Sequence, residues 1–313
     1  MTPDLDFDES QRAIAEAVAR FCREEGAEAL ARAEGAPFPR DFWRGLGALG
    51  VFALAEPGGE GGAGELAAAF EALGAAACPG PLAAQVFAVR ALRSPERGAL
   101  ARGEALAAVG APPLLAFAPE ADVFVELDGD AAWLARPLGA VVAVASLGGE
   151  PLGRVALERV AALEGVREAR ALSDVARAAW SVGAGRRLLE VAVEHARTRR
   201  QFGRAIGEFQ AVAHPLADVH IRLSAAEGLA RAAAWALDAG AGDALLRAGA
   251  ARLAAEGASR RALRTAHQTL GALGMMLEGP LFHLSRRVRQ LAALPPDAAH
   301  AEAAVLAPLG LGE

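Results

Sequence analysis

The sequence contains no lysine, no asparagine and no tyrosine, and its 313 residues include only two cysteines. Because lysine is absent, arginine supplies all 32 permanently basic side chains. Cys22 and Cys78 lie far apart in the sequence, and neither belongs to a CxxC motif or a paired Cys/His pattern. We therefore predict neither a disulfide framework nor a metal site, and we expect a reducing, cytoplasmic location.

Long apolar runs and blocks of one charge are also missing. Arginine, glutamate or glycine interrupts each apolar run before the roughly 18 residues that a membrane helix needs, so no membrane insertion is expected. The net charge is −6 and the basic residues are spread among acids, which argues against a nucleic-acid-binding surface. Four acidic residues precede the first apolar periodicity, unlike the start of a secretory signal.

Helical periodicity dominates both ends of the chain, which is 53% hydrophobic and can bury a large core. Asp8 and Gln11 form the D-x-x-Q pattern of a capping box, and a helix is expected from there to about Glu25. Further short helices are predicted over 40–49, 64–76 and 81–93. Long ones are predicted over 173–199, 206–238, 241–274 and 280–293, with a last helix near 297–308, which is typical of an antiparallel bundle.

The residue pattern in the middle of the chain differs from the helical periodicity on either side. Between Gly103 and about Gly165, short apolar runs are punctuated by proline and glycine, which predicts a small antiparallel sheet. The predicted fold is therefore mainly α-helical with a small β middle domain. It comprises an N-terminal helical domain (1–102), a small β domain (103–168) and a C-terminal helical bundle (169–313).

Residues 195–214, "HARTRRQFGRAIGEFQAVAH", place four arginines and a Phe-Gly pair between two predicted helices. A guanidinium can hold a pyrophosphate with two directed hydrogen bonds, and a helix that begins after a glycine turn offers free N–H groups. Arg199 and Gly203 are placed to supply these two features. The alternative is a solvated helix end whose cations complement the helix dipole.

The extended segment "ARTRRQFGRAIGEFQAVAHPLADV" resembles the R-x-Q-F-G-x-P-I-x-x-F-Q-x-x-x-H-x-L-A-D pattern of the acyl-CoA dehydrogenase family. The residues that fall on the pattern are Arg199, Gln201, Phe202, Gly203, Ile206, Phe209, Gln210, His214, Leu216, Ala217 and Asp218. "ALGVFALAEPGGEGGAG" (48–64) and "AHQTLGALGMMLEGPLFHLSRR" (266–287) add weaker support. The resemblance extends over nearly the whole chain.

This resemblance implies an FAD-dependent oxidoreductase that acts on the CH–CH bond of an acyl-CoA thioester. In the family, the arginine segment reaches the FAD of a neighbouring subunit. Arg199, Phe202, Gln268 and Gly271 are the cofactor-binding residues that the resemblance implies. It also implies a homodimer or tetramer, or a heteromer with a second family chain.

The family reaction needs a carboxylate to remove the α-proton while the flavin accepts a hydride. An ungapped alignment from Glu278 and Pro280 places Pro295 where the family usually has its catalytic glutamate. Asp297 lies two residues further on. Some members instead carry the base at the head of the first bundle helix, where this chain has Ser173 with Asp174 adjacent. Asp174 and Asp297 are the candidate bases. The alternative is that Asp174 is only an acid in the first helical turn beside an N-cap Ser173, and that Asp297 caps the last helix.

The family's T-E-P-x-x-G-S-D segment, which contacts the flavin ring, is missing from residues 103–165. Two alternatives to an active enzyme therefore stay open. The first is a non-catalytic subunit that completes the flavin site of an active partner. The second is a helical scaffold that binds no flavin. A nicotinamide site at the G-x-G-x-x-G of Gly59–Gly64 is disfavoured because a helix, not a parallel strand, is expected to follow.

Overall fold

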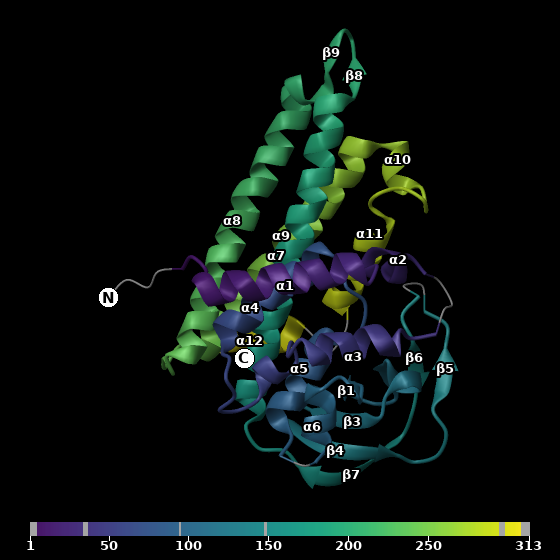
Figure 1. Ribbon diagram of the computed structural model, residues 1–313, viewed down its shortest axis with the longest axis vertical. Coiled ribbons are helices and arrows are strands. Elements are labelled where there is room, and N and C mark those ends of the chain that lie inside the picture. Colours follow the sequence, from purple (N-terminus) through teal and green to yellow (C-terminus); the bar gives the residue numbers. More distant parts are fainter. Residues whose placement is uncertain (1–4, 34–36, 94, 147–148, 294–297, 308–313) are drawn as a thin grey trace.

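A tall bundle of three long helices dominates the computed structural model, which describes residues 5–33, 37–93, 95–146, 149–293 and 298–307 (Figure 1). The three helices are α7 (Val166–Thr198), α8 (Gln210–Asp238) and α9 (Ala244–Leu270). Three shorter helices follow, α10 (Ala272–Met275), α11 (Phe282–Ala293) and α12 (Ala298–Leu306). The predicted bundle is confirmed, although α7 begins at Val166 rather than at 173.

The early start of α7 changes the surroundings of the residues expected to cap it. Gly165 has φ +64° and precedes the first helical turn, so the helix begins there. Ser173 then lies inside the helix, fully buried, and its hydroxyl donates to the carbonyl of Ala83 at 3.0 Å. Ser173 is therefore not an N-cap and Asp174 does not lie in the first helical turn, so this alternative for Asp174 is wrong.

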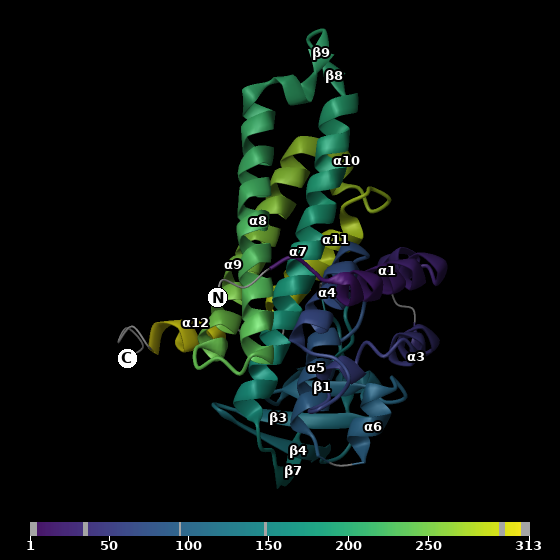
Figure 2. The same ribbon diagram turned by 60° about the vertical axis from the view of Figure 1, so that its left-hand side comes forward.

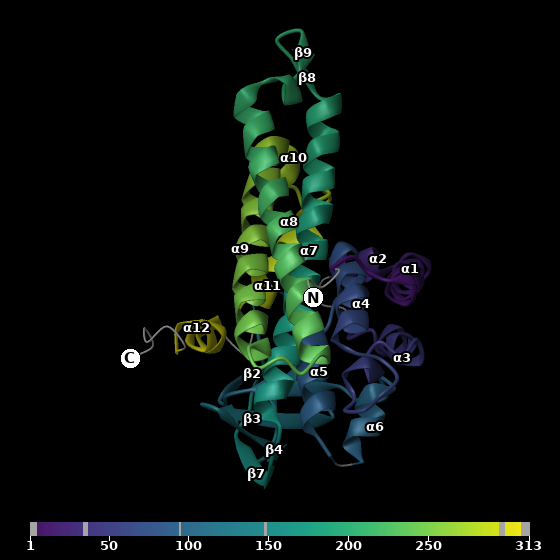
Figure 3. The same cartoon turned by 90° about the vertical axis from the view of Figure 1, so that its left-hand side faces the viewer.

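Six helices precede the strands and lie along one flank of the bundle (Figure 3). They are α1 (Glu9–Glu24), α2 (Ala27–Arg32), α3 (Arg40–Ala48), α4 (Ala63–Ala75), α5 (Leu82–Ala91) and α6 (Glu96–Ala101). The predicted capping box is confirmed, because Gln11 N donates to Asp8 at 2.9 Å and Asp8 N donates to the Gln11 side chain at 3.2 Å.

Close backbone contacts fix α4 against the bundle. A Cβ at Gly74 would lie 2.0 Å from the Trp180 carbonyl oxygen, and one at Gly183 would lie 1.9 Å from the Glu71 carbonyl oxygen. Only glycine allows α4 and α7 to approach this closely. The first turn of α4 is capped from a distance, since Ala63 N and Gly64 N donate to the Asp238 carboxylate at 2.7 and 2.9 Å.

Seven of the described strands lie at the base of the bundle and form two small sheets (Figure 1). One has the order β1 (Ala107–Gly110), β3 (Val123–Asp128), β4 (Ala131–Pro137) and β7 (Leu157–Ala162). The other has the order β2 (Leu114–Ala116), β6 (Leu152–Arg154) and β5 (Val142–Val144). The expected single antiparallel sheet is therefore wrong in two respects, the division into two sheets and the parallel pairing of β1 with β3.

The parallel pair has a physical reason. β2 leaves the first sheet to pair with β6, and the chain crosses over before β3, which therefore returns in the direction of β1. The strands β1 and β3 are buried along almost their whole length, as expected for strands covered on both faces. One continuous hydrophobic core contains residues from the N-terminal helices, the strands and the bundle.

Candidate functional site

A β-hairpin forms the far end of the bundle, at the bend expected between α7 and α8 (Figure 2). It consists of β8 (Arg200–Gln201) and β9 (Arg204–Ala205). The two turn residues, Phe202 and Gly203, have φ of +51° and +81°, as a two-residue type I′ turn requires. A bulky residue at positive φ is strained, and such strain gathers at functional sites. The Phe202 residue is nevertheless 91% exposed.

A groove of about 650 Å³ lies between this hairpin and α9, and we name it the arm groove. The hairpin side and the start of α8 contribute an apolar wall, and α9 contributes a polar wall. The residues that matter for its chemistry are Phe202, Ile206 and Phe209 on the first wall, and Arg261, Arg264 and Gln268 on the second. The structure thus brings together two predicted cofactor residues, Phe202 and Gln268.

The apolar wall of the arm groove presents aromatic faces. The rings of Phe202 and Phe209 meet edge to face, with centroids 6.1 Å apart. The Arg204 guanidinium lies over the Phe209 ring, 4.0 Å from its centroid. A flat aromatic ligand can stack or pack against such a surface.

The arginines around the arm groove are available for a ligand. Neither Arg199 nor Arg264 forms an ion pair with any residue that the structure describes, whereas Arg261 lies 3.6 Å from Asp218. Arg199 caps the C-terminus of α7 and Gly271 caps that of α9, and neither lines the groove itself. Exposed guanidinium groups beside aromatic rings and an amide suit the adenosine diphosphate half of FAD.

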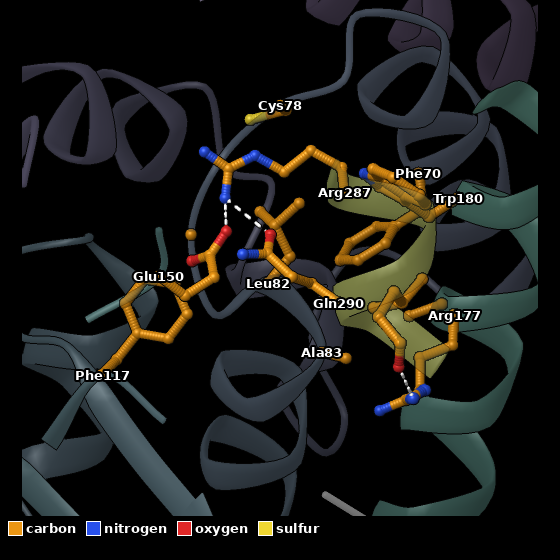
Figure 4. Close-up of a pocket in the computed structure, with 13 residues that line it drawn as sticks. Phe70, Cys78, Leu82, Ala83, Phe117, Glu150, Arg177, Trp180, Arg287 and Gln290 are labelled. Atoms are coloured by element: carbon orange, nitrogen blue, oxygen red, sulfur yellow. Dashed lines mark hydrogen bonds and ion pairs between the residues drawn. The ribbon is translucent and has the colours of Figure 1, made fainter. Parts of the chain in front are cut away.

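A second site lies where α4, α5, α7, α11 and the strand region meet, and we name it the junction cavity (Figure 4). Its volume is about 40 Å³, which is room for a few water molecules. Phe70, Leu82, Phe117 and Trp180 give it apolar walls, and Arg177, Arg287 and Glu150 give it charge. One of the two candidate bases, Asp174, belongs to α7, a helix that walls this cavity.

Arg287 and Glu150 form a buried ion pair in the junction cavity, with side chains 10% and 8% exposed. Arg287 also donates to the Gln290 side-chain oxygen at 3.1 Å (Figure 4). Burial lowers the pKa of Arg287 to about 10, so the guanidinium stays charged at neutral pH. Among the described residues, the Nε–H of Arg287 and the Nε1–H of Trp180 have no acceptor.

Asp174 lies inside α7, 3% exposed, in a buried group of four charges that we name the ionic quartet. Arg252 donates to Asp174 at 2.9 Å and to Glu256 at 3.1 Å, and Arg177 donates to Glu256 at 3.2 Å. Burial raises the pKa of Asp174, and the two arginines oppose that shift. Asp174 does not line the junction cavity, whereas Arg177, one helical turn further on, does.

Asp297, the other candidate base, lies outside the described residues. Sequence reasoning missed Arg287 and Glu150. The signal for Arg287 was present, because it shares a helix face with the buried Leu284 and Val288 and the cavity-lining Leu291, where an arginine is unexpected. Glu150 stands between two glycines and a proline and gave no such signal.

Within the described residues, neither the glycine-rich stretch of residues 59–64 nor the metal-ligating residue types form a ligand-binding arrangement. The helix after Gly59–Gly64 is α4, and its first N–H groups already donate to Asp238. No group of three or more metal-ligating side chains is brought together within the described ranges. In the same ranges, no helix has the length and apolar character needed to cross a bilayer.

Comparison with known families defines the class of the protein. The family described as acyl-CoA dehydrogenase, N-terminal domain, matches residues 8–92, and acyl-CoA dehydrogenase, C-terminal domain, matches residues 164–294. Together with the arm hairpin and the bundle, these matches show that the chain belongs to the acyl-CoA dehydrogenase family. The strand region lies between the two matched segments.

Individual relatives sharpen this placement. The chain is 31% identical over 252 residues to acyl-CoA dehydrogenase IpdE2 of Mycobacterium tuberculosis, covering 73% of this chain and 76% of that protein. For the first three curated relatives, the aligned part covers 16%, 76% and 32% of the relative's own length. The fold is also similar to the ChsE4–ChsE5 complex from Mycobacterium tuberculosis, with TM-score 0.79, 23% identity and coverage of 98% and 99%. PigA with FAD and proline gives TM-score 0.81, 22% identity and coverage of 99% and 100%.

Proposed function

We propose that this chain is a subunit of a flavin-dependent acyl-CoA dehydrogenase that contributes its arm groove to the FAD of a neighbouring chain. Arg199 and Arg264 bind the pyrophosphate, and Phe202 and Gln268 contact the adenosine half. Bound FAD supplies the acceptor for the hydride that leaves the acyl thioester. The observation that carries the proposal is the arm groove, where Arg264, which forms no ion pair with the described residues, and the aromatic rings stand at an exposed tip that a second chain can reach.

We further infer that the chain does not itself dehydrogenate acyl-CoA. Removal of the α-proton needs a carboxylate that can accept a proton beside the substrate. Around the junction cavity, the described carboxylates of Glu150, Asp174 and Glu256 each form an ion pair with an arginine of the chain itself, so each is already engaged rather than facing a substrate. The cavity of about 40 Å³ also has no space for an acyl chain.

The partner in this proposal is a second acyl-CoA dehydrogenase chain that carries the catalytic glutamate and the flavin-ring segment. The ChsE4–ChsE5 complex supports such a pairing, because two named family chains occur together in it. In the pair, this chain supplies the distal half of the flavin site and the partner supplies the base. The acyl-CoA then binds to the partner.

A second candidate is a homodimer or tetramer that binds FAD and uses Asp174 or Asp297 as its base. One observation favours it. Burial raises the pKa of Asp174, as suits a proton acceptor, and Asp174 lies one turn from the cavity-lining Arg177. A shift of α7 by one residue would be needed to turn Asp174 toward the cavity.

One set of measurements on the purified chain distinguishes the two candidate functions. Flavin absorbance, sedimentation and dye reduction by a panel of acyl-CoAs are recorded for the chain alone and after coexpression with a family chain that carries the glutamate. We expect retained FAD and dye reduction only in the coexpressed preparation. Arg199→Ala and Arg264→Ala should lower its FAD occupancy, and the exposed Arg93→Ala serves as the control.

Three outcomes contradict the proposal. Dye reduction by the chain alone, abolished in Asp174→Asn but not in Asp297→Asn, would establish the homomeric enzyme with Asp174 as base. The reverse pattern would assign the base to Asp297. A colourless protein in both preparations would leave only the flavin-free scaffold.

A further inference from the structure

The junction cavity continues into a second space, and a single ion pair divides the two. The second space, which we name the outer cleft, measures about 330 Å³. Gly80, Phe117, Glu150 and Arg287 line both spaces. The Glu150–Arg287 pair is therefore a partition that stands between the outer cleft and the junction cavity.

The partition leaves hydrogen-bond donors without acceptors. Trp180 is 3% exposed and the Arg287 side chain 10% exposed, yet Trp180 Nε1–H and Arg287 Nε–H have no acceptor among the described residues. A buried N–H without a partner costs about 1–3 kcal/mol, so such groups usually mark a bound water or ligand. Both groups line the junction cavity and need an oxygen acceptor.

The walls of the outer cleft specify the rest of the ligand. Leu30, Phe38, Phe117 and Val144 line it with apolar atoms. At its inner end, Glu150 presents a carboxylate to Arg287. A side-chain carboxylate held on a buried guanidinium occupies the position that the carboxylate of a ligand would take.

We propose that the outer cleft binds a small organic carboxylate with a short apolar tail, which displaces Glu150 from Arg287. The ligand carboxylate accepts from Arg287, including its Nε–H, so this donor gains an acceptor. The tail lies against Phe38, Phe117 and Val144. Glu150 turns into the cleft, where water solvates it. This site is separate from the arm groove and needs neither FAD nor a second chain.

Glu150 competes with the ligand from within the same molecule, so removing its charge should strengthen binding. We expect Glu150→Gln to bind hexanoate about tenfold more tightly than the unaltered chain, because a tethered competitor is lost. Isothermal titration with hexanoate measures this on the flavin-free chain. Glu158→Gln, which alters an exposed glutamate paired with Arg136, is the matched control and should bind hexanoate like the unaltered chain.

A second readout covers the case in which Glu150→Gln is unstable. Its unpaired buried arginine should lower the melting temperature, and saturating hexanoate should restore it, whereas hexanol and hexylamine should not. Arg287→Gln combined with Glu150→Gln should abolish the hexanoate effect. Equal stabilisation by hexanol and hexanoate, or equal hexanoate affinity for Glu150→Gln and Glu158→Gln, would overturn the proposal.

Discussion

The arginines at the two ends of the bundle are used in opposite ways. At the arm groove, Arg199 and Arg264 are exposed and form no ion pair with the described residues. At the junction, the guanidinium groups of Arg177, Arg252 and Arg287 are buried and each meets a carboxylate. The charge at the tip is therefore free for an anionic ligand, whereas the charge inside is already neutralised by the chain itself.

This difference indicates which arginines stabilise the fold and which remain able to bind a ligand. A buried pair stabilises a unique packing only while both partners are present, and losing one of them is costly. An exposed arginine contributes little to stability and can be altered without loss of the fold. Stability and ligand binding should thus respond to arginine and carboxylate changes at opposite ends of the molecule.

The largest effect is expected from breaking the ionic quartet. Among the described ion pairs, Asp174→Asn removes the one between Asp174 and Arg252 and leaves the buried Arg177 and Arg252 to share the Glu256 carboxylate. The free energy of unfolding should fall by about 3 kcal/mol. Urea denaturation measures it, with the exposed Asp243→Asn as control, which should change stability little. If both variants unfold at the same urea concentration, the quartet does not stabilise the fold.

The exposed tip should show the reverse pattern. Arg264→Ala should weaken binding of FAD to the assembled protein by about 2 kcal/mol, as for one charge-assisted contact. Its urea midpoint should stay within error of the unaltered chain. Fluorescence titration of the apoprotein with FAD measures the binding. Unchanged affinity would remove Arg264 from the flavin site, and lost stability would break the contrast between the two ends.

A smaller effect is expected at the hairpin turn. Phe202 holds φ at +51°, which costs a non-glycine residue about 1 kcal/mol. Phe202→Gly should therefore raise the free energy of unfolding by up to that amount, while FAD affinity falls because the aromatic wall is lost. Measuring both the free energy of unfolding and the FAD affinity of this variant tests whether the strained conformation of Phe202 serves FAD binding. A variant that gains stability and keeps its FAD affinity would assign Phe202 no binding role.

A pH-dependent effect is expected at His283, a buried histidine of α11. Burial, and then the charge of Arg32, lowers the pKa of His283 from 6.5 to about 4. The unfolded chain therefore binds a proton that the folded chain refuses between these pH values, and stability should fall as the pH drops through that window. Urea unfolding at pH 7 and pH 5 measures the loss. His283→Gln should reduce the difference, and an identical difference in both proteins would assign the loss to other groups.

Local sequence signals predicted what depends on neighbouring residues. The capping box at Asp8 and Gln11, the C-terminal end of α8 and the turn at Gly203 follow from hydrogen bonds and backbone preferences within a few positions. The sequence could indicate residues of the arm groove because Phe202 and Gln268 belong to recognisable motifs. That both line one groove depends on the packing of α8 and α9.

The sequence did not predict the contacts between elements that are far apart in the chain. The pairing of Asp174 with Arg252 and of Glu150 with Arg287 joins elements far apart in the chain, and nothing near either carboxylate signals its partner. The parallel pairing of β1 with β3 depends on where β2 finds its partner, β6. Such features are set by tertiary packing, which composition and periodicity do not encode.

The distant cap on α4 has a consequence for how the chain folds as it is made. Ala63 and its capping partner Asp238 are 175 positions apart, so the carboxylate leaves the ribosome long after α4 has emerged. Until then, the first turn of α4 lacks its acceptor and its glycine-rich approach stays loose. The first turn of α4 can therefore gain this cap only after α8 has been synthesised, so full capping of α4 is a late step for the nascent chain.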